Sequence, residues 1–199
     1  MNEYDYHQVL NYCKSERKLD TFFEIAKIGK KFHDANIENV FKIHPEKIFL
    51  LEPFLNEPRS MILFGGVGRG KTYASIALIK ELAKNHSMRE IRYINSHEID
   101  EKSLELSNDG RELNIFFSNL SKVKILFIDD FGMNRITERT IRDMYKIIDY
   151  RWSHELVTVV STNMKPTQIK EVYGERISSR MNLFQEIYFS GEDLRCSRT

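Results

Sequence analysis

Short apolar runs alternate with amphipathic segments along most of the chain. The apolar runs predict five strands, at residues 61–64, 91–95, 124–128, 156–160 and 185–189. Between them, apolar side chains recur at three- and four-residue steps, which is the period of a helix with one buried face. Helices are expected at residues 73–85, 97–120 with a break at 108–110, 137–152, from 166 onward, and 175–181. Strands and helices in this alternation predict an α/β fold with a parallel five-stranded sheet and helices on both faces.

The first 60 residues follow a different pattern. Residues 4–31 are mixed and mostly helix-like, whereas residues 32–60 contain Pro45, Pro53 and Pro58. Proline interrupts regular structure, so we expect residues 32–60 to be an irregular connection that wraps onto the main domain. We therefore divide the chain into a short helical N-terminal extension with its connecting segment, 1–60, and a main domain, 61–199.

Composition narrows the functional classes. The 199 residues are 41% hydrophobic, which suits one globular domain with a sizeable core. A net charge of +1 gives no global electrostatic attraction to nucleic acid or to an anionic membrane. Cys13 and Cys196 are too few for a disulfide framework or a zinc site, and the histidines show no metal-ligand spacing. No run reaches the ~18 apolar residues of a spanning helix, and the N-terminus is polar, so we expect a cytoplasmic protein.

A glycine-rich loop between the first strand and the following helix is the clearest motif. It fits G-x-x-x-x-G-K-[ST] with Gly65, Gly66, Val67, Gly68, Arg69, Gly70, Lys71 and Thr72. Such a loop points successive backbone N–H groups at phosphate oxygens, and the helix that opens near Tyr73 adds its positive end. Lys71 would reach the β- and γ-phosphates, and the Thr72 hydroxyl would bind Mg²⁺. A chance glycine turn is the alternative, but the strand before and the helix after favour a site for ATP with Mg²⁺.

Polar residues end two further strands. Asp129 and Asp130 follow a buried strand, and Asn163 follows the next one. Ligands bind at the carboxyl ends of the strands in open α/β sheets. Asp129 would therefore hold Mg²⁺, Asp130 would orient and deprotonate the attacking water, and Asn163 would contact the γ-phosphate or that water. The alternatives are a solvated acidic turn for the aspartates and a simple turn former for Asn163.

Arg176 and Arg180 lie four residues apart, so they share one face of a predicted helix. One of them could act as an arginine finger on the γ-phosphate of a neighbouring subunit. Ordinary surface arginines have the same spacing, and spacing alone does not separate these alternatives.

Together these motifs resemble the DnaC-like and DnaI-like helicase loaders and the IstB-like transposition ATPases of the AAA+ superfamily. The resemblance runs from about Ile28 to Arg195 and covers most of the chain. It includes the entry segment 28–35, the loop 65–72, the run 126–132 with its double aspartate, 161–163, 174–181 and 191–195. It implies an AAA+ P-loop NTPase fold, with residues 61–199 as the ATPase domain.

The resemblance also implies roles and partners. Arg180 would be the arginine finger with Arg176 in support, and Arg195 would be a sensor-2-like residue that contacts the nucleotide. Family members bind a replicative DNA helicase and single-stranded DNA and oligomerise through the ATP site, so a homo-oligomer is expected with ATP. Helicase loaders usually carry a longer N-terminal domain than residues 1–27, so the usual mode of helicase binding does not follow here.

Three functions are therefore open. The first is an ATP-driven helicase loader in DNA replication, which would bind single-stranded DNA weakly as an isolated subunit because the net charge is near zero. The second is an ATPase accessory to transposition. The third is a helicase-binding adaptor that does not hydrolyse ATP, against which the intact set of motif residues argues.

Overall fold

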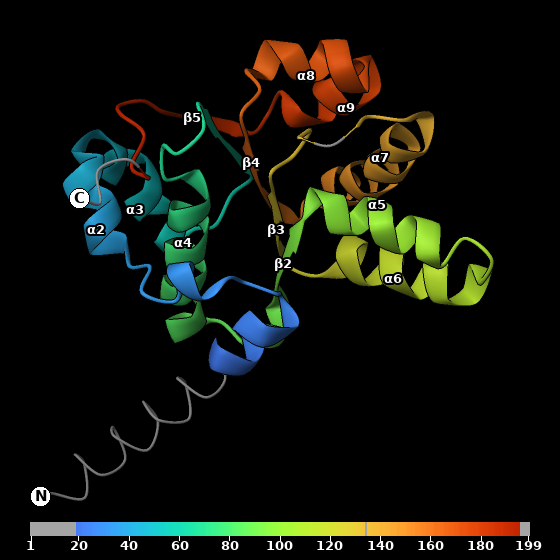
Figure 1. Cartoon of the computed structure of the whole chain (residues 1–199), viewed down its shortest axis with the longest axis horizontal. Helices are drawn as coiled ribbons and strands as arrows, with labels where there is room; N and C mark the ends of the chain where they lie inside the picture. Colours follow the sequence, from blue (N-terminus) through green and yellow to red (C-terminus); the bar gives the residue numbers. More distant parts are fainter. Residues whose placement is uncertain (1–18, 134, 196–199) are drawn as a thin grey trace, which may run out of the picture.

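A five-stranded parallel sheet forms the centre of the molecule (Figure 1). The structure is a computed structural model that describes residues 19–133 and 135–195. The strands stand in the order β2-β3-β4-β1-β5, and every neighbouring pair is parallel. Their bounds are β1 (Met61–Gly65), β2 (Ile91–Asn95), β3 (Ile125–Asp129), β4 (Val157–Thr162) and β5 (Gln185–Phe189). The predicted α/β fold with five parallel strands is confirmed.

The N-terminal part of the described chain and one long helix cover the first face of the sheet. These elements are a helical segment at 19–25, α2 (Ile37–Ile43), α3 (Ile48–Asn56) and α4 (Lys71–Asn85). Their apolar side chains form one core cluster with alternate strand residues such as Leu63 and Phe127. Two short 3₁₀ turns, η1 (Lys30–Phe32) and η2 (Pro45–Lys47), connect the first three helices.

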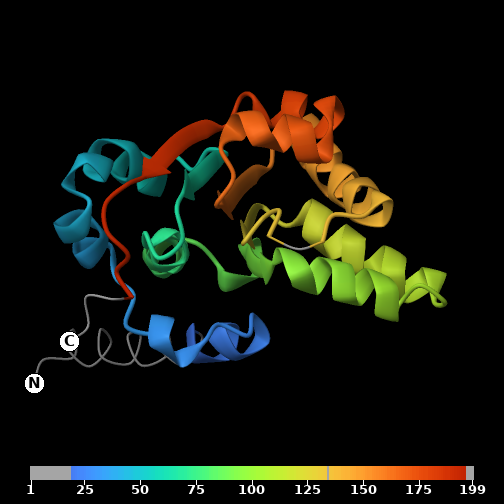
Figure 2. The ribbon, with the colours of Figure 1, turned by 45° about the horizontal axis from the view of Figure 1, so that its top comes forward.

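Five helices cover the opposite face, as the two views of Figures 1 and 2 show. They are α5 (Ser96–Glu105), α6 (Gly110–Lys122), α7 (Glu138–Ser153), α8 (Pro166–Tyr173) and α9 (Glu175–Met181). The turn η3 (Met88–Glu90) leads from α4 into β2. Ile62 and Leu126 belong to this second cluster, whereas Leu63 and Phe127 belong to the first. Strand residues thus alternate between two buried faces, which explains the continuous apolar runs in the sequence.

The expectation that residues 32–60 are irregular was wrong, because this region contains α2 and α3. The region does pack onto the main domain, as the sequence led us to expect. Asn36 starts α2 by accepting a hydrogen bond from the backbone of Asn39 at 2.8 Å. Pro45 occupies the first turn of η2, where its missing N–H costs little. Pro53 lies inside α3, but Leu51 and Phe54 of that helix are completely buried in the first core cluster. Burial of these side chains outweighs the hydrogen bond that Pro53 removes.

The remaining expectations concern a helix break, the division of the chain, its first residues and membrane crossing. The break predicted at 108–110 is confirmed, since Asp109 accepts hydrogen bonds from two backbone N–H groups and starts α6. The predicted division at residue 60 falls between α3 and β1, and the apolar residues on its two sides share one core. The helix-like pattern predicted for 4–18 and both cysteines lie outside the described residues. Within the described ranges, none of the helices combines the length and apolarity that crossing a membrane requires.

Candidate nucleotide-binding site

The loop between β1 and α4 has the backbone of a phosphate cradle. Gly68 and Gly70 both have positive φ angles, 73° and 87°, which glycine adopts without strain. A Cβ at Gly68 would also collide with the carboxylate of Asp193. Gly70 directly precedes α4, a helix of 15 residues, so the free N–H groups at the start of α4 face the loop. The sequence therefore folds here into an anion-binding turn at a helix N-terminus.

Lys71 lies within this cradle with its side chain almost completely buried. Its Nζ donates hydrogen bonds to the backbone oxygens of Gly65 at 2.8 Å and Gly66 at 2.7 Å, and to Oδ1 of Asn163 at 2.7 Å. Burial lowers the pKa of Lys71 below its ordinary value, while the charges of Asp130 and Asp129 act in the opposite direction. The loop and the end of β4 thus hold one partly desolvated ammonium group at a defined point.

Asp129 sits behind Thr72 at the end of β3, and only 3% of its surface is exposed. The Thr72 hydroxyl donates to its carboxylate at 3.0–3.1 Å, the Tyr93 hydroxyl donates at 2.7 Å, and the Ser161 hydroxyl donates as well. Burial raises the pKa of Asp129 above its ordinary value, and the hydroxyl donors partly offset this shift. A hydroxyl and a carboxylate in contact provide the oxygen ligands that Mg²⁺ prefers.

Asp130 has a left-handed backbone, with a φ of 53°, that neighbouring elements hold in place. Its N–H donates to Ser161 Oγ at 3.2 Å, and its carbonyl accepts from Ser96 Oγ at 2.7 Å. Its carboxylate accepts from Asn95 Nδ2 at 3.4 Å. Such a conformation in a residue other than glycine is uncommon and clusters at functional sites. Asp130 lines the cavity above the glycine loop, whereas Asp129 is not among the residues that line this cavity.

A cavity of about 680 Å³ opens above the cradle. This size is within the usual range of small-molecule sites. The predicted residues that line it are Val67, Gly68, Arg69, Gly70, Lys71, Thr72, Tyr73, Asp130, Asn163 and Arg195. The N-terminal region closes its other side with Lys31, Phe32, Asp34, Asn39, Lys42 and Ile43, and Leu194 lies beside Arg195. Most of the predicted nucleotide-binding set therefore converges on one cavity.

Arg69 supplies a test of whether phosphate fits. Its Nη1 is buried and has no hydrogen-bond partner within the described part of the chain. The backbone around it is fixed, because Arg69 O contacts His44 Nε2 at 3.0 Å and Gly68 O accepts from Leu194 N at 2.9 Å. A buried guanidinium nitrogen without a protein partner beside a glycine cradle can be satisfied by an anion or by a water molecule. The residues present therefore fit a polyphosphate group.

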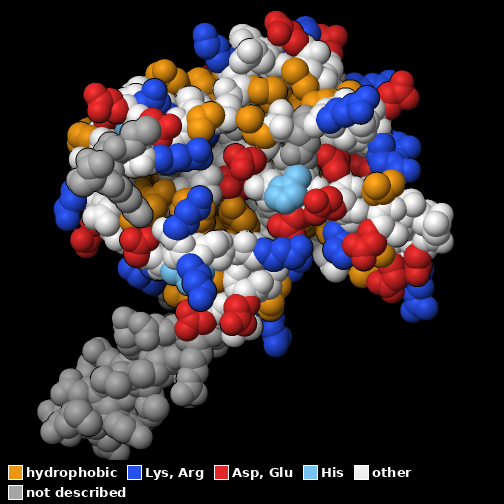
Figure 3. All heavy atoms as spheres, viewed as in Figure 1, with side chains coloured by type: hydrophobic (Ala, Val, Ile, Leu, Met, Phe, Trp, Pro, Cys, Tyr) orange, Lys and Arg blue, Asp and Glu red, His pale blue; other side chains and the backbone are white. Residues whose placement is uncertain are grey.

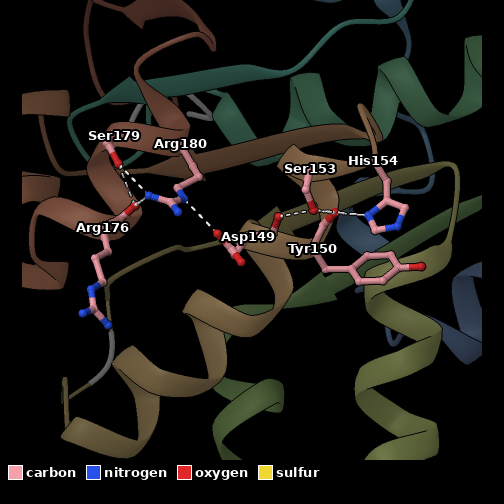
Figure 4. Close-up of polar contacts among 7 residues, drawn as sticks. All are labelled: Asp149, Tyr150, Ser153, His154, Arg176, Ser179 and Arg180. Carbon is pink, nitrogen blue, oxygen red and sulfur yellow. Dashed lines mark hydrogen bonds and ion pairs between the residues drawn. The ribbon is translucent and has the colours of Figure 1, made fainter.

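Arg176 and Arg180 do not line the cavity in the described structure. Figure 4 shows Arg180 between Ser179 and Asp149, with the Arg176 side chain pointing away from them. Arg180 Nε donates to Asp149 Oδ1 at 2.9 Å, and its guanidinium lies 5.2 Å from the ring centre of Trp152. Both arginines belong to α9, which packs on the face of the sheet opposite α4. An action of Arg180 on its own cavity is therefore not supported by this arrangement.

Sequence reasoning missed several residues that build the site. Tyr93 and Ser161 hold Asp129, His44 holds the loop, and residues 31–43 close the cavity. A tyrosine in the middle of β2 and a hydroxyl run at the end of β4 were available signals for the first two. The contribution of residues 31–43 depends on tertiary packing, and the resemblance to the family's entry segment covered only residues 28–35.

The family of IstB-like ATP binding proteins matches residues 10–181 of this chain. A curated relative, the chromosomal replication initiator protein DnaA of Caldanaerobacter subterraneus subsp. tengcongensis, is 26% identical over 120 residues. That match covers 60% of this chain and 27% of the relative, so the chain spans about a quarter of the relative's length.

Two solved structures share the fold over most of their length. The DnaC helicase loader superposes with a TM-score of 0.71 at 17% identity, over 81% of this chain and 100% of that chain. DnaI superposes with a TM-score of 0.67 at 24% identity, over 84% of this chain and 94% of that chain. At these identities the two structures establish a common architecture.

Proposed function

Because the chain belongs to the family of IstB-like ATP-binding proteins, we propose that it binds ATP with Mg²⁺ in the cavity above the 65–72 loop and hydrolyses it during DNA replication. Membership of this family and the AAA+ fold make the chain an ATPase. The observation that carries the assignment of the site is the convergence of Lys71, Thr72, Asp130 and Asn163 on one cavity. These residues come from three different elements, and chance does not bring such a set together.

The phosphates would lie in the glycine cradle. The N–H groups at the start of α4, the Lys71 ammonium and the unpartnered Nη1 of Arg69 all favour negative charge there. Tyr73 and the side chains from residues 31–43 would then enclose the rest of the nucleotide, and Arg195 would approach from the C-terminal segment. The cavity thus provides a charged end for the phosphates and a mixed end with Phe32 and Ile43 for the base.

Thr72 and Asp129 would hold Mg²⁺ beside the phosphates. When bound, this ion neutralises charge on the transferred phosphoryl group. Asp130 faces the cavity and is placed to orient a water molecule and accept its proton. Asn163 positions Lys71 through its Oδ1, and its amide Nδ2 lies 3.2 Å from Met133 Sδ at the cavity side of β4.

Arg180 would complete the site of a neighbouring subunit, with Arg176 in support. The location of α9 and the ion pair with Asp149 keep Arg180 away from its own cavity. A guanidinium supplied in trans stabilises the charge of the phosphoryl-transfer transition state. We therefore propose that ATP promotes a homo-oligomer in which each active site contains residues of two subunits.

The function in replication that we favour is loading of a replicative DNA helicase, with weak binding of single-stranded DNA. Support comes from the shared fold with a helicase loader over nearly its whole length. Lysine, arginine and carboxylate side chains are interspersed on the face shown in Figure 3. The net charge of the chain is +1, so one subunit offers little counterion release. We expect a dissociation constant for single-stranded DNA on the order of micromolar or weaker at physiological salt. The matched family also leaves open an ATPase accessory to transposition.

Substitution of Lys71 tests the site. We expect Lys71→Ala to weaken binding of a fluorescent ATP analogue by about 10- to 100-fold, because a hydrogen bond from a charged donor contributes roughly 1.5–3 kcal/mol. ATP turnover should fall with it. Lys84→Ala is the matched control, since Lys84 lies on the same helix with a side chain that is 66% exposed and paired with Glu81. Equal affinity of Lys71→Ala and the wild type would show that the site is assigned wrongly.

Affinity capture of the full chain from its native host, with and without a non-hydrolysable ATP analogue, tests the partner. Recovery of the replicative helicase supports the helicase-loader proposal. Recovery of a transposase, with stimulation of its activity, would favour the transposition alternative. Helicase binding without any ATP turnover would favour the non-hydrolysing adaptor and contradict the ATPase mechanism.

A further inference from the structure

Three hydroxyl groups from three different elements converge on the carboxylate of Asp129. Tyr93 comes from β2, Ser161 from β4 and Thr72 from α4, while Asp129 ends the strand between β2 and β4. Oδ2 accepts from Tyr93 and Thr72, and Oδ1 accepts from Ser161 and Thr72. Both carboxylate oxygens are therefore fixed from opposite sides of β3.

Tyr93 is well suited to hold this carboxylate still. Its ring is only 7% exposed and belongs to the first core cluster, so packing fixes the position of the hydroxyl. A carboxylate accepts hydrogen bonds, so the Tyr93 hydroxyl is the donor to Asp129 Oδ2. The O–H···O distance of 2.7 Å is that of a well-formed hydrogen bond.

The orientation of Asp129 in turn determines the orientation of Thr72. A hydroxyl group has one proton and two lone pairs. Because the Thr72 proton points at the Asp129 carboxylate, its lone pairs point elsewhere and are available to a cation. A change in the angle of the carboxylate would therefore turn the Thr72 lone pairs as well.

We propose that Tyr93 is a positioning residue of the magnesium site, which acts through Asp129 to orient both Asp129 and Thr72 for Mg²⁺. This inference rests on the proposed function, since it assumes that Mg²⁺ binds with the nucleotide. Groups that orient metal ligands through hydrogen bonds typically change metal affinity 10- to 100-fold when they are removed. The opposing interpretation is that Tyr93 only fills the core and finds a partner for its hydroxyl.

Tyr93→Phe in the full chain removes the hydroxyl and keeps the ring. The measurement is the affinity for a fluorescent, non-hydrolysable ATP analogue, first in excess EDTA and then with Mg²⁺ titrated at fixed analogue. We expect unchanged affinity in EDTA and about a 10-fold higher Mg²⁺ concentration at half-effect. Tyr173→Phe is the matched control, because Tyr173 is likewise a buried tyrosine but belongs to the second core cluster and makes no hydrogen bond with Asp129 in the described part of the chain. It should titrate like the wild type.

Ser161→Ala provides a second variant that does not depend on the stability of Tyr93→Phe. It should shift the Mg²⁺ titration in the same direction, because Ser161 holds the other carboxylate oxygen. Tyr93→Phe with a wild-type Mg²⁺ titration, or with equal losses in EDTA and in Mg²⁺, would overturn the inference and leave the proposed function intact. If the wild-type chain itself does not bind the analogue, the proposed function fails instead.

Discussion

The buried carboxylate of Asp129 destabilises the folded protein but supplies a ligand for the proposed Mg²⁺ site. Only 3% of the surface of Asp129 is exposed to solvent. Among the described residues, no cation forms an ion pair with its carboxylate. Burial holds its pKa above the ordinary value, with the neighbouring charge of Asp130 adding to the shift. The folded protein therefore keeps a carboxylate where its charge is unfavourable, and the proposed Mg²⁺ site would account for that cost.

We predict that Asp129→Asn stabilises the nucleotide-free protein while it abolishes the Mg²⁺ dependence of nucleotide binding. The amide has nearly the same shape and no charge to desolvate, while its Nδ2 must donate to one of the hydroxyls that donate to the carboxylate, so we expect a net gain of about 1 kcal/mol. Urea unfolding at pH 7 without nucleotide measures the effect. Asp143→Asn is the control, because Asp143 is equally buried but pairs with Arg142 and Lys146, so its loss should destabilise the protein.

The gain in unfolding free energy that Asp129→Asn produces should depend on pH. Because the folded-state pKa is raised above the value of 3.8 for an ordinary aspartate, the stability that Asp129 contributes is fully present below about pH 4 and is lost as the pH rises through the folded-state pKa. The difference in unfolding free energy between variant and wild type should therefore grow from acid to neutral pH and then level off. A constant difference across this range would contradict the assigned cause.

Arg151 joins three elements at the end of the sheet opposite the site. Its guanidinium, 1% exposed, donates to backbone oxygens at the end of α6 and before β3, and to Val157 and Thr158 at the start of β4. Burial lowers its pKa to about 9. The acceptors offset part of that desolvation, so the interaction fixes where α6 and α7 meet the sheet.

We predict that Arg151→Met lowers the free energy of unfolding by about 3 kcal/mol, because several buried carbonyl groups lose their donor. Nucleotide affinity of the folded fraction should not change, since the site lies at the carboxyl ends of the strands. Denaturant unfolding and analogue binding measure the two quantities. Arg142 lies on the same helix with a side chain that is 60% exposed, so Arg142→Met should lower the free energy of unfolding much less. Equal losses for the two variants would contradict the role of Arg151.

The elements of the sheet were predictable because β1 and β3 are continuous apolar runs and the other strands are short, mostly apolar segments between helical patterns. The same property located Lys71, Thr72, Asp130 and Asn163 together, since parallel strands bring their carboxyl ends to one edge. The helix α3 was not predictable from local pattern, because Pro53 signals a break and only the burial of Leu51 and Phe54 explains the helix. Tyr93 was missed for a similar reason, since its partner Asp129 lies 36 residues away.

The two parts of the proposed catalytic site lie on different layers of the fold. The nucleotide cavity lies beside α4 and the N-terminal helices, whereas Arg180 lies on α9 across the sheet. Arg180 is partly exposed and contacts Asp149, Tyr145 and Trp152, with 46% of Trp152 exposed beside it. This separation favours an oligomer in which the α9 side of one copy approaches the cavity of the next.

We predict that two inactive variants restore ATP turnover when they are mixed. Arg180→Ala keeps an intact cavity but supplies no finger, and Asp130→Asn supplies the finger but has no base. In a random equimolar mixture, about one quarter of the sites would combine an intact cavity with an intact neighbouring arginine. Turnover measured against the mixing ratio should therefore pass through a maximum near equal amounts and rise with total concentration.

The control mixture replaces Arg180→Ala with Arg142→Ala, a surface variant that should be active alone and should lose turnover as Asp130→Asn is added. If the arginine acts in trans, turnover of the control mixture should fall in proportion to the added Asp130→Asn, whereas the first mixture should pass through a maximum, because only the first creates competent sites from incompetent ones. The contrary outcome is a mixture of Arg180→Ala and Asp130→Asn that stays inactive at every ratio while the wild type assembles and hydrolyses ATP under the same conditions. That result would place the action of Arg180 within its own subunit or outside catalysis.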